Sequence, residues 1–333
     1  MNSSWVAGGV FLITYALVVS ERVHRTLAAL AGGMAMMLLG VLSQVEAFAA
    51  VDWNVIFLLV GMMSIAAVFR STGLFQRIAV QAVKQGGGRP IRILVMLSLI
   101  TAFTSAFLDN VTIVVLVVPV TLFVAASLHI SPMPFLIAEI LACNIGGTAT
   151  LIGDPPNILI ASAADIDFVT FLAHMAPISL VILACFVVLA WFLFKRDLSR
   201  APVDGLDVQA LDASQLITDR KLLRKALTVT AAVMLGFLLQ GVTGLQPATI
   251  AMVGATALLL WGKCDPHLVL RDVEWTTLFF FLGLFIVVEG VVRVGLIETA
   301  AHGALQVTGG NLPLTSISLL WLSALFSGIV DNI

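Results

Sequence analysis

Long apolar runs alternate with short polar clusters along the whole chain. The runs cover residues 5–20, 26–42, 53–69, 91–107, 111–128, 134–162, 171–194, 226–241, 247–262, 275–292 and 312–330. Many are long enough to cross a bilayer as a helix, which takes about 20 apolar residues. They lack the strict alternation that a membrane-spanning β-barrel needs. The pattern therefore predicts an all-α polytopic membrane protein.

Composition points to the same lipid environment. Apolar residues make up 60% of the 333 positions and charged residues only 11%, which excludes an ordinary soluble domain. The net charge is −2 and the basic residues form no stripe, so no nucleic-acid partner is expected. No Lys or Arg precedes the first apolar run, which predicts a retained helix instead of a cleaved signal peptide.

The cysteines have no spacing that indicates a metal site or a disulfide framework. Cys143, Cys185 and Cys264 lie in or beside apolar runs, and none forms a CxxC pair. We expect them to be packing residues, and we expect no metal site.

Basic residues are distributed unequally between the polar clusters. With the amino terminus outside, all but one of the 17 Lys and Arg residues fall on the cytoplasmic side, and only Arg293 lies outside. The cytoplasmic set is Arg22, Arg25, Arg70, Arg77, Lys84, Arg89, Arg92, Lys195, Arg196, Arg200, Arg220, Lys221, Arg224, Lys225, Lys263 and Arg271. The positive-inside rule therefore predicts an inner-membrane protein with an external amino terminus and with Asp165 outside.

The chain matches itself without gaps when it is shifted by 222 positions. The matched pairs include Trp53 with Trp275, Phe57 with Phe279, Gly61 with Gly283, Gly73 with Gly295, and Asp109 and Asn110 with Asp331 and Asn332. If residues 91–128 form a re-entrant hairpin, the first copy crosses the membrane an odd number of times and the second copy is inverted. Inverted repeats are typical of secondary transporters.

This repeat divides the chain into three expected parts. Residues 1–196 form the first inverted repeat, 197–225 a cytoplasmic loop, and 226–333 a second repeat that is cut short. Ile333 matches Val111, so a chain that ended there would leave half a hairpin in lipid. We expect the complete protein to extend by about 85–95 residues and to carry a second helix break.

Two polar segments interrupt the apolar runs. SAFLDNVT, at Ser105–Thr112, places Asp109 and Asn110 among roughly forty otherwise uncharged residues, where an ionisable group costs about 2.5–3.5 kcal/mol. NIGGTATLIGDPPN, at Asn144–Asn157, is too rich in Gly and Pro for a continuous helix and predicts a break in mid-membrane. Half-helix ends at one depth can bind ions or a polar solute through free amides and carbonyls.

The predicted binding residues carry a carboxylate, an amide or a hydroxyl, or are glycines of the break. They are Asp109, Asn110, Thr112, Asn144, Gly146, Gly147, Thr148, Asp154 and Asn157, with Asp331 and Asn332 from the second copy. Glu139 is a candidate proton carrier, and its alternative role is a polar contact between helices. The alternative for Asp109 and Asp154 is helix capping, because Asp154 precedes Pro155. No catalytic residue is expected.

FLDNVT followed by NIGGTATLIGDPPNILI resembles the arsenite-permease and P-protein branch of the ion-transporter superfamily over essentially the whole chain. It is similar also to the more distant divalent-anion sodium symporters, which have Ser-Asn-Thr at the hairpin tip. The resemblance implies a homodimer in lipid, in which hairpins and broken helices move against a scaffold in an elevator cycle. The chain departs from the symporter pattern at Asp109 and Asp154, where neutral hydroxyl residues would suit a dicarboxylate.

These two carboxylates favour a neutral or cationic passenger. A pair about 5 Å apart would repel by about 3 kcal/mol at an effective dielectric near 20, so a proton or cation should be shared. We therefore expect a secondary transporter of a small solute, arsenite or antimonite by resemblance. Protons or sodium are the expected coupling ions, and no other cofactor is expected. Recognition would use oxygen and nitrogen groups, because only Cys143 offers sulfur nearby.

Other functions remain as alternatives. A sodium/proton antiporter would use the same aspartates, and a citrate- or dicarboxylate-like symporter would share the fold. Broken-helix repeats favour alternating access over an ion channel. An aspartyl protease is disfavoured because Gly153-Asp154 lacks the earlier glycine of a GxGD motif. Residues 195–225 contain no nucleotide-binding glycine motif, so a self-contained ATPase is not expected, and the sequence leaves open a separate ATPase partner. As a transporter, the protein is not expected to be an enzyme.

Overall fold

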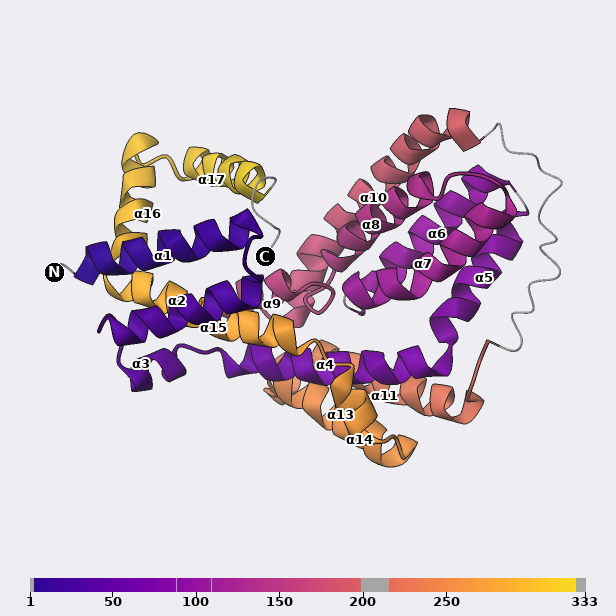
Figure 1. Cartoon of the computed structure of the whole chain (residues 1–333), viewed down its shortest axis with the longest axis horizontal. Coiled ribbons are helices and arrows are strands. Elements are labelled where there is room, and N and C mark those ends of the chain that lie inside the picture. Colours follow the sequence, from indigo (N-terminus) through magenta and orange to yellow (C-terminus); the bar gives the residue numbers. More distant parts are fainter. Residues whose placement is uncertain (1–2, 88, 109, 199–215, 328–333) are drawn as a thin grey trace. The chain divides into compact units, whose positions relative to one another are not determined.

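The computed structural model describes residues 3–87, 89–108, 110–198 and 216–327, whose regular structure is helical throughout (Figure 1). The helices are α1 (Ser3–Ser20), α2 (Arg25–Leu38), α3 (Gln44–Ala49), α4 (Trp53–Thr72), α5 (Leu74–Gly86), α6 (Pro90–Ser105), α7 (Asn110–Ser127), α8 (Met133–Gly147), α9 (Pro155–Ala163), α10 (Phe168–Leu198), α11 (Arg220–Leu238), α12 (Gln240–Thr243), α13 (Pro247–Gly262), α14 (Pro266–Arg271), α15 (Trp275–Arg293), α16 (Leu296–Val307) and α17 (Leu312–Ser327). The prediction of an all-α polytopic membrane protein is confirmed.

Several of these helices suit a bilayer by length and apolar composition. In the described part of the chain, four are long and apolar enough to cross a membrane: α1, α4, α15 and residues 168–196 of α10. Apolar helices of 10–17 residues include α2, α6, α8 and α13. Since lipid offers backbone amides no hydrogen-bond partner, helices are the structure that such runs must adopt.

The apolar pattern missed α5 and α16, which follow α4 and α15. Each begins after a glycine in the left-handed region, Gly73 and Gly295, both with φ of 74°. A residue with a side chain is strained in that conformation. Polar residues interrupt both helices, so they do not read as apolar runs and were not predicted.

Helix boundaries recur along the chain with the spacing of the sequence match. The helices α3, α4, α5 and α6 begin at residues 44, 53, 74 and 90, and α14, α15, α16 and α17 begin at 266, 275, 296 and 312. Gly87 and Gly309 also share one φ value, 61°. The same order of elements is thus used twice, while the inverted orientation of the second copy stays a prediction.

The chain divides into two compact units, one made of residues 1–56 and 274–333 and the other of residues 57–273. The expected parts 1–196, 197–225 and 226–333 follow the sequence match, whereas each unit combines helices from both copies. Both ends of the expected loop are helical, because α10 continues to Leu198 and α11 begins at Arg220.

The two units use equivalent glycine contacts. In the first unit α15 packs on α2, where a Cβ on Gly283 would lie 2.5 Å from the carbonyl carbon of Ala29. In the second unit a Cβ on Gly61 of α4 would lie 2.8 Å from the carbonyl carbon of Ala251 in α13. Both pairs are related by the same spacing of 222 residues. Only glycine permits backbones to approach this closely.

In the second unit, α6, α7 and α8 lie side by side, with α5 and α10 against them (Figure 1). Their shared face is closely packed and apolar, with Ile93, Leu97, Ile113 and Phe135 fully buried. This packing fixes the ends of α6, α7 and α8, which carry the polar segments.

Candidate functional site

Four helix ends meet at the two polar segments. The hairpin helices contribute the carboxyl end of α6 at Ser105 and the amino end of α7 at Asn110. The predicted break is present, because α8 ends at Gly147 and α9 begins at Pro155. Amide groups at the amino ends favour anions and carbonyl groups at the carboxyl ends favour cations.

Asn110 lies at the centre of this arrangement and is held on two sides. The Ser105 hydroxyl donates to its Oδ1. Its own Nδ2 donates to Asn144 Oδ1 at 3.3 Å and to Asp154 Oδ2 at 3.2 Å. Cys143 Sγ lies 3.2 Å from Ser105 Oγ and 3.4 Å from the carbonyl oxygen of Asn110. The hairpin and the broken helix are therefore joined by one polar cluster, which we call the Asn110 cluster: Ser105, Asn110, Cys143, Asn144 and Asp154.

Asp154 occupies the N-cap position of α9 without capping it. Its backbone is extended, with φ of −146° and ψ of 135°, and its side chain makes no hydrogen bond to the first turn. The carboxylate instead accepts from Asn110. Pro155 is at the first position of α9, as predicted. The structure thus shows no side-chain cap from Asp154 to α9.

Asn157 stabilises the break between α8 and α9 through two hydrogen bonds. Its Nδ2 donates to the carbonyl oxygens of Gly147 at 3.0 Å and of Thr150 at 2.8 Å. Thr150 in turn donates to the carbonyl oxygen of Ala106 and accepts from the Gly153 amide at 3.1 Å. Because both donors of the Asn157 amide are used on backbone carbonyls, this residue holds the loop in shape.

The glycines of the break permit close approach of backbone and side chains. A Cβ on Gly146 would lie 2.5 Å from the carbonyl carbon of Ala102 in α6, and one on Gly147 would lie 2.7 Å from Asn110 Oδ1. A Cβ on Gly153 would lie 2.8 Å from the carbonyl oxygen of Ser105. Since no side chain fits at these distances, Gly146, Gly147 and Gly153 are required by geometry.

Three other predicted residues lie beside the Asn110 cluster. Thr148 Oγ1 bonds to the carbonyl oxygen of Ile145 at 2.8 Å and lies 3.1 Å from Ser179 Oγ of α10. Thr112, in the first turn of α7, accepts from Arg70 Nη2 at 3.2 Å. Glu139 is buried in α8, one turn before Cys143, and accepts a hydrogen bond from Thr121 of α7. Asp109, Asp331 and Asn332 lie outside the described residues.

Arg70 was not predicted to be a site residue. Its positive charge was used only to predict the orientation of the chain in the membrane. Arg70 is in the last turn of α4 and also lies 3.7 Å from Asp272 Oδ2, with both side chains about one-third exposed. The signal was its position directly after a long apolar run. Ser105 and Thr150 were missed too, because serine and threonine are common in membrane helices and carry no distinctive spacing.

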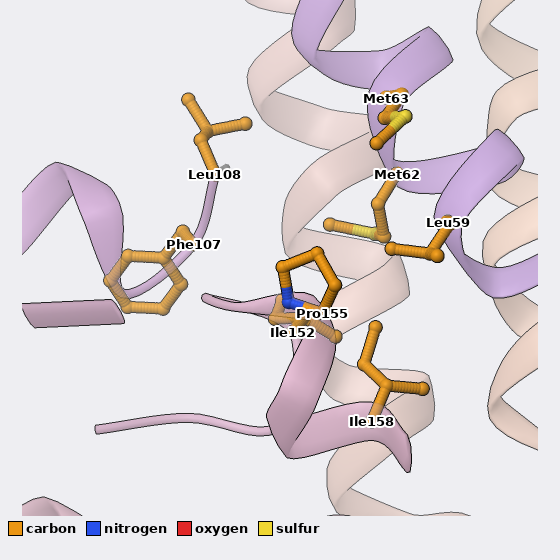
Figure 2. A pocket seen from close by; sticks show the side chains of 8 residues that line it. All are labelled: Leu59, Met62, Met63, Phe107, Leu108, Ile152, Pro155 and Ile158. Carbon is orange, nitrogen blue, oxygen red and sulfur yellow. The ribbon is translucent and has the colours of Figure 1, made fainter. Parts of the chain in front are cut away.

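A small apolar pocket separates the hairpin turn from α4. Figure 2 shows its lining: Phe107 and Leu108 from the turn, Ile152, Pro155 and Ile158 from the broken helix, and Leu59, Met62 and Met63 from α4. The cavity measures about 10 Å³, which is at the lower limit for one water. Apolar side chains of the hairpin turn, the broken helix and α4 therefore line one small cavity.

Comparison with known proteins identifies the family. The family model described as citrate transporter matches residues 15–333. The chain belongs to the citrate transporter family. It is accordingly a transporter and a multi-pass membrane protein, and the resemblance to the ion-transporter superfamily is confirmed.

Relatives in this family include bacterial and animal membrane proteins. An uncharacterized transporter of Mycobacterium tuberculosis is 42% identical over 334 residues, covering 99% of this chain and 78% of that protein. The 46 kDa membrane protein of Mycobacterium leprae is 41% identical over 334 residues, with the same coverage of 99% and 78%. The human P protein is 33% identical over 410 residues, covering 98% of this chain and 49% of the P protein.

Proposed function

We propose that this protein is a secondary transporter that moves a small carboxylate-bearing anion through the Asn110 cluster, together with a cation or protons. The observation that carries the proposal is the meeting of four helix ends around the Asn110 side chain. The amino ends of α7 and α9 offer amide donors to anionic oxygens. The carboxyl ends of α6 and α8 offer carbonyl oxygens to a cation.

Charge near the hairpin supports an anionic solute in place of the neutral or cationic passenger expected from Asp109 and Asp154. Arg70 contacts Thr112 two residues after Asn110, so a guanidinium group lies beside the amino end of α7. Guanidinium groups match carboxylates in geometry and charge. The description of the matched family, citrate transporter, makes citrate the first solute to test.

The Asp154 carboxylate supports a co-transported cation. It lies with Asn144 on the side of Asn110 that faces the broken helix. A carboxylate and an amide oxygen next to helix carbonyls are suitable ligands for sodium or another hard cation. The sodium/proton antiporter remains the alternative that this group also supports.

Arsenite or antimonite, the solute expected by resemblance, is the second solute to test. The sulfur ligand in the Asn110 cluster is the Cys143 thiol, which contacts Ser105 and Asn110. Soft metalloids prefer several thiolates, so recognition would depend on oxygen and nitrogen groups here.

The experiment is a flux assay in proteoliposomes. Labelled citrate and arsenite are compared under imposed proton and sodium gradients, with wild type, Asn110→Ala and Arg70→Gln. We expect gradient-driven citrate uptake that both variants reduce. Asn54→Ala, an exposed asparagine at the start of α4, is the matched control and should retain wild-type flux. Arsenite flux without citrate flux contradicts the anion proposal, and sodium-stimulated proton flux without either solute supports the antiporter.

Location and assembly are part of this proposal. We place the protein in the inner membrane with its amino terminus outside, as a homodimer that works by an elevator movement. These features derive from the distribution of basic residues and from the superfamily resemblance.

A further inference from the structure

Glu139 is a buried carboxyl group that lies outside the Asn110 cluster. Its side chain in α8 is only 2% exposed. The Thr121 hydroxyl of α7 donates to Oε1. In the part of the chain that the structure describes, Oε2 is buried and has no hydrogen-bond partner. A buried polar atom without a partner indicates a function or an unseen proton, water or ion.

Among the residues that the structure describes, the helices packed on α8 place no charged side chain beside Glu139. Within Asn110–Ser127, α7 carries no titratable side chain. In α6 the charged residue is Arg92. Both α6 and α8 are antiparallel to α7 and both end at the Asn110 cluster, with Ala102 against Gly146 and Ser105 against Cys143, so α6 and α8 are parallel. Arg92 is exposed in the first turn of α6, at the end opposite Ser105, whereas Glu139 is buried in the middle of α8.

Helix α10, the third helix packed on α8, offers Glu139 no closer charged partner among the described side chains. Its His174 is exposed and bonds to the Thr170 carbonyl oxygen of its own helix. Its Cys185 is exposed, and Lys195 and Arg196 are in its last turn. On α8 itself the neighbouring titratable group is Cys143. Among the ion pairs of the described residues, none includes Glu139.

We propose that Glu139 is a proton-binding site of the transport cycle, in which Oε2 carries the proton while Thr121 of α7 bonds to Oε1. An ionised Glu139 in this position would be a buried charge with one hydrogen bond, which is strongly unfavourable. The neutral acid needs only the bond from Thr121. The proton passes between Oε2 and water, and no other reactant is required.

Release of the proton is linked to movement of the hairpin. Glu139 and Asn144 are on α8, while Thr121 and Asn110 are on α7. A displacement of α7 from α8 that opens the Asn110 cluster also separates Thr121 from Glu139 and admits water. Deprotonation then becomes favourable, because water solvates the carboxylate. Protonation is thus coupled to the closed arrangement of the two helices. This inference rests on the proposed transport function.

Infrared spectroscopy tests the protonation without any solute. The full chain in detergent at neutral pH should show the carbonyl stretch of a protonated carboxylic acid. Glu139→Gln should remove one component of this band, seen in the difference spectrum between wild type and variant, and Thr121→Val, which removes the donor but keeps the carboxyl group, should shift that component. Glu289→Gln, which removes a carboxyl group from α15, is the matched control and should leave the band unchanged. A wild-type spectrum without the band, or a Glu139→Gln spectrum identical to that of wild type, overturns the proposal.

Transport provides the second test, in proteoliposomes with labelled citrate as the probe. Proton-driven citrate uptake is compared with citrate exchange at equal pH on both sides. We expect Glu139→Gln to lower the ratio of driven uptake to exchange by about tenfold or more, and Glu289→Gln to keep the wild-type ratio. A wild-type ratio in Glu139→Gln overturns the proton site. If wild type moves no citrate at all, the proposed solute fails, and the infrared result alone decides the role of Glu139.

Discussion

Asn110 shows how one amide can join elements that are far apart in sequence. Its oxygen accepts from Ser105, and its nitrogen donates to both Asn144 and Asp154. A charged residue in its place would repel or attract Asp154, whereas the amide satisfies both sides of the break without charge. Its removal takes away the oxygen to which the buried Ser105 hydroxyl donates, which costs about 1–3 kcal/mol.

Asp154→Asn tests the charge of the Asn110 cluster separately from helix capping. Asparagine keeps the size of the side chain and an oxygen that accepts from Asn110, but it removes the negative charge. Because Asn and Asp cap helices equally well, a capping role predicts wild-type transport. We expect instead an almost unchanged melting temperature and a loss of gradient-driven citrate uptake. Wild-type uptake with unchanged pH dependence would remove Asp154 from the transport mechanism.

Gly153→Ala tests the close packing of the break. The new Cβ would lie 2.8 Å from the Ser105 carbonyl oxygen, and backbone atoms cannot move aside easily. We expect a destabilisation of about 1–3 kcal/mol, seen as a lower melting temperature, together with reduced transport. The matched control is Gly303→Ala in α16, where nothing lies within 4 Å of the new Cβ. That change should raise stability slightly, since alanine favours helix.

Sequence predicted most helices and the break, but not the direction of each side chain. The Asp154-Pro155 pair predicted the start of α9 correctly. It did not predict that the Asp154 carboxylate accepts a hydrogen bond from Asn110 and makes none to the first turn of the helix. Arg70 could not be assigned because its contact with Thr112 joins α4 to α7 across 42 residues. Such contacts depend on packing between helices, which local periodicity does not specify. The candidate residues were therefore predictable as a set, while their individual partners were not.

Among the helices, α3 illustrates how a short element is fixed by its ends. Ser43 Oγ accepts from the Glu46 amide at 3.3 Å, and Glu46 Oε2 accepts from the Ser43 amide at 2.8 Å. This capping box satisfies two amide groups at once. Glu46 Oε1 also lies 2.6 Å from Arg293 Nη2 at the end of α15. Within the first unit, Glu46 thus connects α3 to α15.

Glu46→Gln tests this connection through its pH dependence. The hydrogen bonds from Ser43, and then the charge of Arg293, hold the pKa of Glu46 below its ordinary value of 4.5. A lowered pKa means that the stabilisation is complete above 4.5 and is lost as the pH falls through the pKa of the folded state. We expect the melting temperature of wild type to fall more on acidification below that value than that of Glu46→Gln. Glu21→Gln, an exposed glutamate outside the capping box, should behave like wild type; an equal acid response in Glu46→Gln would contradict the connection.

The internal sequence match and the two compact units divide the chain in different ways. Gly61 with Ala251 and Gly283 with Ala29 are equivalent contacts, and each joins a helix of the first copy to a helix of the second. Neither copy could therefore complete its own packing without the other. Sequence showed the repeat because residue types recur, but it could not show this exchange of partners, which is a property of tertiary contacts.

The orientation of the chain in the membrane is predicted from its basic residues and can be tested with cysteine labelling. After replacement of the native cysteines, His267→Cys in α14 and Ala164→Cys after α9 place exposed thiols on opposite predicted sides. The positive-inside rule places His267, between Lys263 and Arg271, in the cytoplasm, and Ala164, next to Asp165, outside. An impermeant maleimide added to intact cells should label Ala164→Cys and spare His267→Cys, and inverted vesicles should give the reverse. Labelling of His267→Cys in both preparations would indicate leaky membranes, for which a known cytoplasmic cysteine protein is the control. Labelling of His267→Cys in intact cells with that control unlabelled would invert the predicted topology.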